Sequence, residues 1–154
     1  MSDTSILPIE TGAVNEPNVR KIRDYQKAMA EGRFAEAATI FDADVRYVVP
    51  GNNPLSGDYA GAEAVMGYFG RLMELTGGTY AITQMNWLVC GDDVLLETRN
   101  TARIGANELT WDEAILFRFV AGRKKVIELF QADQAAVDRF FQAAGPGVAA
   151  PDDK

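Results

Sequence analysis

The 154-residue sequence predicts one α+β domain, a cone-shaped, curved antiparallel sheet covered by three helices from the N-terminal half, with a short C-terminal helix. Three observations predict this class. Helical periodicity dominates the first half of the chain, alternating apolar residues dominate residues 79–132, and glycine-containing turns divide that second region into four strands. Because helices on one face of a curved sheet leave space beneath them, we expect a pocket for a small hydrophobic molecule.

The expected domain occupies residues 18–143. Residues 1–17 contain two prolines and no sustained periodicity, so they are expected to form a flexible arm that straps across the body. Residues 144–154 are expected to form a disordered tail.

Apolar residues recur at helical spacing in three stretches of the first half. The first helix is expected to start from Asn18 as its N-cap and to end at Gly32. A shorter helix and then a strand over residues 44–49 follow, and a third helix lies between Gly61 and Gly77. The apolar positions of the three helices are Val19, Ile22, Tyr25 and Met29, then Phe34, Ala37, Ala38 and Phe41, then Val65, Tyr68, Phe69, Leu72 and Leu75.

The second half is expected to form a four-strand antiparallel meander. Its turns are placed at 91–93, 105–107 and 122–124, so Lys124 is expected on a solvated hairpin tip. A short helix then follows Asp133, which is a suitable N-cap.

Composition excludes several classes of function. The net charge of −7 repels a phosphate backbone, so nucleic acid is not an expected partner. The chain has no run of about 18 apolar residues and no signal-peptide pattern, so we expect a cytoplasmic protein without membrane contact.

The sequence contains no histidine and a single cysteine, Cys90. Ser-His-Asp and Cys-His catalysis, a histidine-based metal site, a thiolate metal cluster and an intrachain disulfide are therefore excluded. No metal and no cofactor are expected, and any acid–base chemistry must use carboxylates, tyrosine, lysine or water.

The pairing of the middle strands can be estimated from their turn. A hairpin centred near Ala106 places Arg99 opposite Glu113 and Thr101 opposite Trp111. The same counting places Met85 and Trp87 beside Arg99 and Glu97. Glu113 then lies on the apolar face of its strand.

These positions give a set of candidate site residues. A carboxylate beside arginine stays ionised, whereas an unpaired buried carboxylate has a raised pKa, so the site can supply a base or an acid. The alternative is a purely structural Arg99–Glu113 pair, because the even positions Val94, Leu96 and Ala102 are more apolar than Glu97 and Arg99. The catalytic candidates are Arg99, Glu113, Asp133 and Tyr25, and the ligand-binding candidates are Trp87, Trp111, Phe117, Glu97, Thr101, Gln131 and Tyr59.

The chain resembles the nuclear transport factor 2-like superfamily, within it the SnoaL-like group that is also similar to ketosteroid isomerase. The resemblance covers about residues 18–143. It rests on the order of the elements and on the segments Val49-Pro50-Gly51, Pro54 to Gly61, Leu75 to Thr79, Lys125 to Glu128 and Asp133 to Asp138. Such proteins include isomerases, polyketide cyclases, epoxide hydrolases, dehydratases and non-catalytic binding proteins, so the fold alone selects no activity.

The resemblance implies different roles for particular residues. Tyr25 matches the oxyanion-binding tyrosine of ketosteroid isomerases, but Val49 stands where those enzymes carry the general-base aspartate. Arg99 matches the arginine of limonene-type epoxide hydrolases. The approximate positions of the two aspartates in those enzymes are occupied here by Thr101 and Gln131. Glu113 or Asp133 could supply the pocket acid that SnoaL-type polyketide cyclases use.

We therefore carry three hypotheses from the sequence. The first is a cofactor-independent cyclase, isomerase or epoxide hydrolase that uses carboxylate, arginine and tyrosine. The second is a non-catalytic module that binds a small hydrophobic molecule. The third is a subunit that dimerises through its sheet, and apolar positions Leu96, Ala114 and Leu116 on the convex face favour a homodimer.

Overall fold

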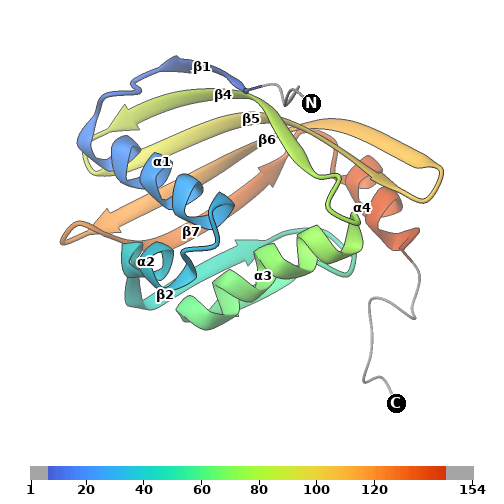
Figure 1. Ribbon diagram of the computed structural model, residues 1–154, viewed down its shortest axis with the longest axis horizontal. Coiled ribbons are helices and arrows are strands. Elements are labelled where there is room, and N and C mark those ends of the chain that lie inside the picture. Colours follow the sequence, from blue (N-terminus) through green and yellow to red (C-terminus); the bar gives the residue numbers. More distant parts are fainter. Residues whose placement is uncertain (1–6, 145–154) are drawn as a thin grey trace.

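A computed structural model of the chain describes residues 7–144 and confirms the α+β prediction. Seven strands form one curved, unclosed sheet, and helices lie against one of its faces (Figure 1). We call this covered face the inner face and the opposite one the outer face. Apart from Ala144, the tail expected over residues 144–154 lies outside the described residues.

The helices follow the predicted order, and their ends are set by side-chain caps. Glu16 caps α1, because its carboxylate accepts hydrogen bonds from the backbone N–H groups of Asn18 and Val19 at 2.8 and 3.1 Å. The prediction of Asn18 as the N-cap was therefore wrong, whereas Asp133 caps α4 as predicted. The helices are α1 (Pro17–Ala30), α2 (Phe34–Ala37), the 3-10 turn η1 (Ala38–Ile40), α3 (Ala62–Leu75) and α4 (Gln134–Gln142).

The predicted four-strand meander is confirmed and forms the centre of a larger sheet. The order across the sheet is β1-β4-β5-β6-β7-β2-β3. The pairs β1–β4 and β2–β7 are parallel, and the other pairs are antiparallel. The strands are β1 (Ile9–Gly12), β2 (Phe41–Val49), β3 (Gly57–Ala60), β4 (Ala81–Cys90), β5 (Asp93–Ile104), β6 (Asn107–Val120) and β7 (Arg123–Gln131).

Strand β1 lies in the segment expected to be an arm, and it runs along the edge of the sheet beside β4. Glu10 connects three elements, because its carboxylate accepts a hydrogen bond from Trp87 Nε1 at 3.0 Å and pairs with Arg23 of α1 at 3.0 Å. At Gly12, where φ is +92°, an added Cβ would lie 2.2 Å from the carbonyl oxygen of Trp87. The close approach of β1 to β4 therefore requires glycine at this position.

The predicted register of the central hairpin was wrong by one residue. Its turn contains only two residues, Gly105 and Ala106, so Arg99 pairs with Asp112. Thr98 stands opposite Glu113, and Asn100 stands opposite Trp111. Because side chains alternate between faces, this single step moves the odd residues of β5 to the outer face.

The pairing of β4 with β5 also differs from the prediction. Met85 pairs with Thr98 and Trp87 pairs with Leu96, rather than with Arg99 and Glu97 as expected. Leu96 was expected on the convex face but is buried on the inner face.

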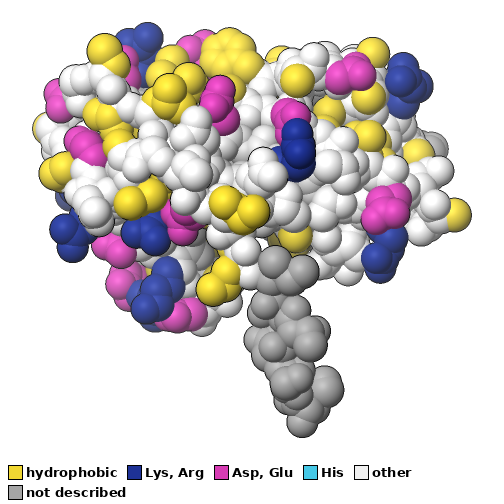
Figure 2. All heavy atoms as spheres, turned by 90° about the horizontal axis from the view of Figure 1, so that it is seen from above, with side chains coloured by type: hydrophobic (Ala, Val, Ile, Leu, Met, Phe, Trp, Pro, Cys, Tyr) yellow, Lys and Arg dark blue, Asp and Glu magenta, His cyan; other side chains and the backbone are white. Residues whose placement is uncertain are grey.

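Figure 2 shows the molecule from above relative to Figure 1. On this face hydrophobic side chains lie among acidic and basic ones, and neither charge forms a broad single-sign area. Among the described residues, every helix is too short or too polar to cross a membrane.

Candidate functional site

A cavity of about 560 Å³ lies between the inner face of the sheet and helices α1, α3 and α4. Phe34 of α2 and Met73 of α3 both line it, although they are 56% and 42% exposed, so the cavity opens to solvent between these helices. Most of its wall is apolar or aromatic. A volume of this size is in the range of sites that bind small molecules.

Glu113 provides the carboxylate of the cavity. It lies at an odd position of β6, on the same face as Trp111 and Phe117, as the alternation of that strand predicted. Its Oε1 atom accepts hydrogen bonds from Trp111 Nε1 and Gln131 Nε2, both at 2.9 Å. Gln131 is its direct neighbour on β7, so the pairing of β6 with β7 aligns these two side chains.

The environment of Glu113 favours its protonated form. Burial raises the pKa of its carboxyl group, and the hydrogen bonds from Trp111 and Gln131 oppose that rise. The residue opposite Glu113 on β5 is Thr98 and not an arginine, and the Thr98 side chain is buried. Glu113 is therefore a buried carboxylate without an arginine partner, the case in which a raised pKa was expected.

The same cluster contains a polar atom without a partner. Gln131 Oε1 is buried and accepts no hydrogen bond from the described residues. An unsatisfied buried acceptor costs free energy, and a ligand with a hydroxyl or N–H group could satisfy it.

Three tyrosines lie close enough to Glu113 to respond to its charge. Burial raises the pKa values of Tyr47, Tyr68 and Tyr80, and the charge of Glu113 raises them further. The Tyr47 and Tyr68 rings pack edge to face with their centroids 4.8 Å apart, and Tyr80 donates to Asn100 Oδ1 at 3.0 Å. The three tyrosine hydroxyls stay protonated at neutral pH, but each carries a single hydrogen, and that of Tyr80 is already donated to Asn100.

Lys124 was expected on a solvated turn but is buried, with only 2% of its surface exposed. The actual turn contains Ala121 and Gly122, so Lys124 belongs to β7. It lines the cavity, and its Nζ atom lies 4.3 Å from the ring centroid of Tyr25 and 4.4 Å from that of Phe117. Burial lowers the pKa of the Lys124 ammonium group to about 7.

Tyr25, the residue that matches the isomerase tyrosine, lines the cavity from α1. Its hydroxyl contacts Met66 Sδ at 4.0 Å, and burial raises its pKa. Val49, at the position of the isomerase base, also lines the cavity and offers only apolar surface there.

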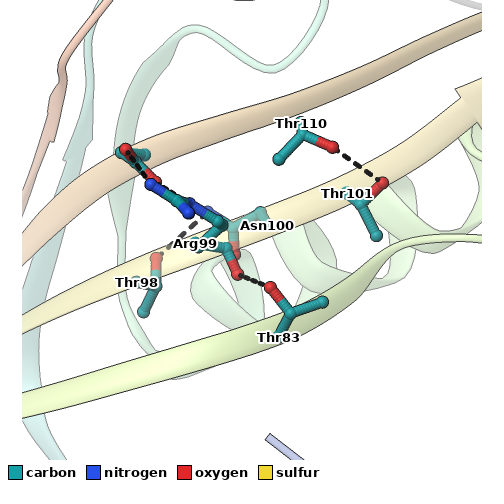
Figure 3. Close-up of polar contacts among 7 residues, drawn as sticks. Thr83, Thr98, Arg99, Asn100, Thr101 and Thr110 are labelled. Atoms are coloured by element: carbon teal, nitrogen blue, oxygen red, sulfur yellow. Dashed lines mark hydrogen bonds and ion pairs between the residues drawn. The ribbon is translucent and has the colours of Figure 1, made fainter. Parts of the chain in front are cut away.

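The corrected register removes Arg99, Glu97 and Thr101 from this cavity. Arg99 forms an exposed, bidentate ion pair with Asp112 at 2.8 and 3.1 Å on the outer face. In Figure 3 Thr110 is hydrogen-bonded to Thr101, while Asn100 is hydrogen-bonded to Thr98. Glu97 accepts a hydrogen bond from Asn86 at 2.8 Å. The expected Arg99–Glu113 pair does not form.

Three further candidates lie outside the wall of the cavity. Trp87 is buried on β4 next to β1, and its Nε1 donates to Glu10 of β1. The Tyr59 hydroxyl donates to the carbonyl oxygen of Leu55 at 2.7 Å, and Asp133 accepts from the backbone N–H of Ala136. Of the predicted set, Tyr25, Glu113, Trp111, Phe117 and Gln131 line the cavity.

Sequence reasoning missed Lys124 and the three tyrosines. The tyrosines lie in β2, in α3 and just before β4, so only the folded chain brings them to one carboxylate. A signal for the correct register was present, because Val94, Leu96 and Ala102 make the even face of β5 the more apolar one.

Comparisons with known proteins agree with this architecture. A family model described as a SnoaL-like domain matches residues 22–128. An uncharacterised protein of Mycobacterium tuberculosis is 32% identical over 115 residues, which cover 74% of this chain and 88% of that protein. The matched family segment contains Tyr25, Glu113 and Lys124.

Two solved structures show the same fold. Bal32a, from a soil-derived mobile gene cassette, is 30% identical with a TM-score of 0.76, and the match covers 84% of this chain and 99% of that one. An NTF2-like protein from Burkholderia xenovorans is 20% identical with a TM-score of 0.69, over 81% of this chain and 95% of that one.

Proposed function

Because the chain belongs to the SnoaL-like domain family of the nuclear transport factor 2-like superfamily, we propose that its cavity binds a small, mostly apolar molecule. We further propose that Glu113 exchanges a proton with that molecule. The reaction class is a cofactor-independent isomerisation or cyclisation, in which a carbon next to a carbonyl group loses and regains a proton.

One observation carries this proposal, namely a carboxylate buried in an apolar cavity without a cationic partner among the described residues. Such a group holds its proton at a higher pH than a solvated carboxylate does, which brings its pKa closer to neutral pH. The unsatisfied Gln131 Oε1 atom beside it supports the presence of a polar group on the bound molecule.

The tyrosines supply the complementary part of the chemistry. When a base removes a proton next to a carbonyl group, negative charge develops on the carbonyl oxygen, and hydrogen-bond donors stabilise that charge. Tyr47 and Tyr68 lie near Glu113 with protonated hydroxyls, whereas the hydroxyl proton of Tyr80 is already donated to Asn100. In this proposal Tyr47 and Tyr68, rather than Tyr25 as the resemblance to ketosteroid isomerase implied, donate hydrogen bonds to the carbonyl oxygen near Glu113.

The test uses 2-tetralone, an apolar bicyclic ketone with exchangeable hydrogens next to its carbonyl group. Proton NMR in D2O follows the loss of these hydrogens in the presence of the parent protein, Glu113→Gln and Asp112→Asn. Glu113→Gln keeps an oxygen that can accept from Trp111 and Gln131, and Asp112 is its neighbour on the outer face.

We expect the parent and Asp112→Asn to accelerate the exchange equally and Glu113→Gln to be slower by about 10²-fold or more, the usual contribution of a general base. Equal acceleration by the parent and Glu113→Gln contradicts the catalytic proposal. Binding of 2-tetralone without any exchange favours the non-catalytic binding module.

We also propose that the outer face forms a homodimer. Leu88, Leu95 and Leu116 are aligned across β4, β5 and β6, and Phe130 of β7 is 51% exposed on the same face. Leu88 is exposed and Leu95 and Leu116 are half-buried, and apolar side chains that reach the surface in a row favour association. Light scattering after size-exclusion chromatography should give twice the mass of the chain, and Leu95→Asp should reduce it to a monomer. A parent protein that is monomeric at micromolar concentration contradicts this proposal.

A further inference from the structure

The proposed function does not use Lys124, although this side chain is the buried amine of the cavity. Among residues 7–144 its Nζ atom contacts aromatic rings and takes part in no ion pair. A buried ammonium group without an acidic partner is costly, so a lysine at such a position needs an explanation.

A β-bulge directs Lys124 into the cavity. Arg118 of β6 pairs with Val126, but the next residue, Phe119, pairs with Lys124, so Lys125 is the extra residue of β7. Without this insertion, regular alternation from Ile127 would place Lys125 on the inner face and Lys124 on the outer face. The bulge exchanges the two lysines, and bulges often reorient side chains next to active sites.

The surroundings of Lys124 are aromatic. Tyr25 of α1, Phe41 of β2 and Phe117 of β6 place their ring centroids 4.3, 5.4 and 4.4 Å from Nζ. Tyr25 is the titratable group among them, and burial raises its pKa, so it stays neutral. These rings interact with an ammonium ion but cannot accept its proton.

The surroundings also affect the reactivity of the amine. Burial lowers the pKa of Lys124 to about 7, so a large share of the amine is unprotonated at neutral pH. A desolvated lysine of this kind is a nucleophile towards carbonyl compounds.

We propose that Lys124 captures an aldehyde or ketone group of an apolar molecule in the cavity and forms an imine with it. This inference deepens the proposed function, on which it rests, by naming a carbonyl compound as the ligand. The unprotonated Nζ attacks the carbonyl carbon, and a proton moves from nitrogen to oxygen to give a carbinolamine. Loss of that oxygen as water then gives the C=N bond, and addition of water reverses the sequence.

The two polar parts of the cavity suit a bifunctional or elongated ligand. Lys124 pairs with Phe119, which lies six residues from Glu113 along β6, or about 20 Å of extended strand. Imine formation and proton exchange therefore take place at separate parts of the cavity and can be tested separately.

The test uses 2-naphthaldehyde at pH 7, which has no exchangeable hydrogen next to its carbonyl group and so does not depend on Glu113. Sodium cyanoborohydride converts an imine into a stable secondary amine, and intact mass with peptide mapping locates the adduct. Lys124→Met and Lys124→Arg remove the proposed nucleophile. Lys125→Arg is the matched control, because the bulge keeps the Lys125 side chain off the inner face. The alcohol 2-naphthalenemethanol measures binding without reaction.

We expect one adduct on Lys124 in the parent and in Lys125→Arg, at a level at least ten times that on any other lysine. Neither Lys124 variant should carry it, while Lys124→Arg should still bind the alcohol. If the alcohol binds but label spreads over exposed lysines or is absent, the imine proposal is wrong and the proposed function stands. If neither the aldehyde nor the alcohol binds the parent, both proposals are wrong.

Discussion

Replacing Lys124 by methionine should stabilise the protein, and the gain should depend on pH. The pKa of Lys124 falls from 10.5 to about 7 on folding, because burial disfavours the charged amine. Between these values the unfolded chain therefore binds more protons at this residue than the folded chain does. The free energy of unfolding of the parent must then rise with pH in this window, whereas the methionine variant lacks this contribution.

The size of the effect follows from the two pKa values. Below pH 7 the amine is protonated in both states, and the full penalty for burying the charge is present. Each pH unit above 7 relieves up to about 1.4 kcal/mol, since one pKa unit corresponds to that free energy. Because only half of the folded-state amine is unprotonated at pH 7, the slope there is about half of its full value, and the stability difference between Lys124→Met and the parent should shrink by about 2 kcal/mol from pH 7 to pH 9.

Urea unfolding followed by tryptophan fluorescence at pH 6, 7, 8 and 9 measures this difference. Lys125→Met removes the same charge from the neighbouring position, where the side chain keeps contact with solvent, so its difference from the parent should stay nearly constant. A Lys124→Met difference that is equally constant, or that widens towards pH 9, refutes the buried and unpaired state of Lys124.

Four other substitutions test the remaining contacts. Glu113→Ala leaves Trp111 Nε1 and the Gln131 amide without their acceptor, and urea unfolding should show a loss of about 2–3 kcal/mol. Relative to Glu113→Gln, the parent should lose stability as the pH rises above about 4.5, because folding raises the pKa of Glu113. Arg99→Met breaks an exposed ion pair, so it should change stability by less than about 1 kcal/mol and leave 2-tetralone exchange unchanged. Gly12→Ala should lower the thermal midpoint, because its Cβ would overlap the Trp87 carbonyl.

The sequence alone predicted the central part of the site. The odd positions of residues 111–119 are apolar except for Glu113, and this pattern placed the carboxylate on the inner face. The burial of one face is a strong constraint on a strand, so the position of Glu113 did not depend on the details of its neighbours.

The partners of Glu113 were harder to predict because they depend on turn length. A two-residue turn at Gly105-Ala106 and a turn centred on Ala106 differ by one step of register, which decides whether Arg99 or Thr98 faces the carboxylate. The position of Lys124 depends on a bulge, and no local sequence pattern in β7 marks the extra residue. The register of the β5–β6 hairpin and the bulge in β7 are both set by pairing between strands, so a single strand's sequence does not reveal them.

The central claim, that the cavity binds a small apolar molecule, can be tested by calorimetric titration with 2-tetralone. Ile115 lies on the cavity wall, so Ile115→Trp should occupy part of the 560 Å³. Arg118 lies on the same strand with an exposed side chain, and Arg118→Trp adds the same group outside the cavity. We predict that the parent and Arg118→Trp bind 2-tetralone alike and that Ile115→Trp binds at least tenfold more weakly. Equal binding by all three proteins, or none by the parent, contradicts the claim.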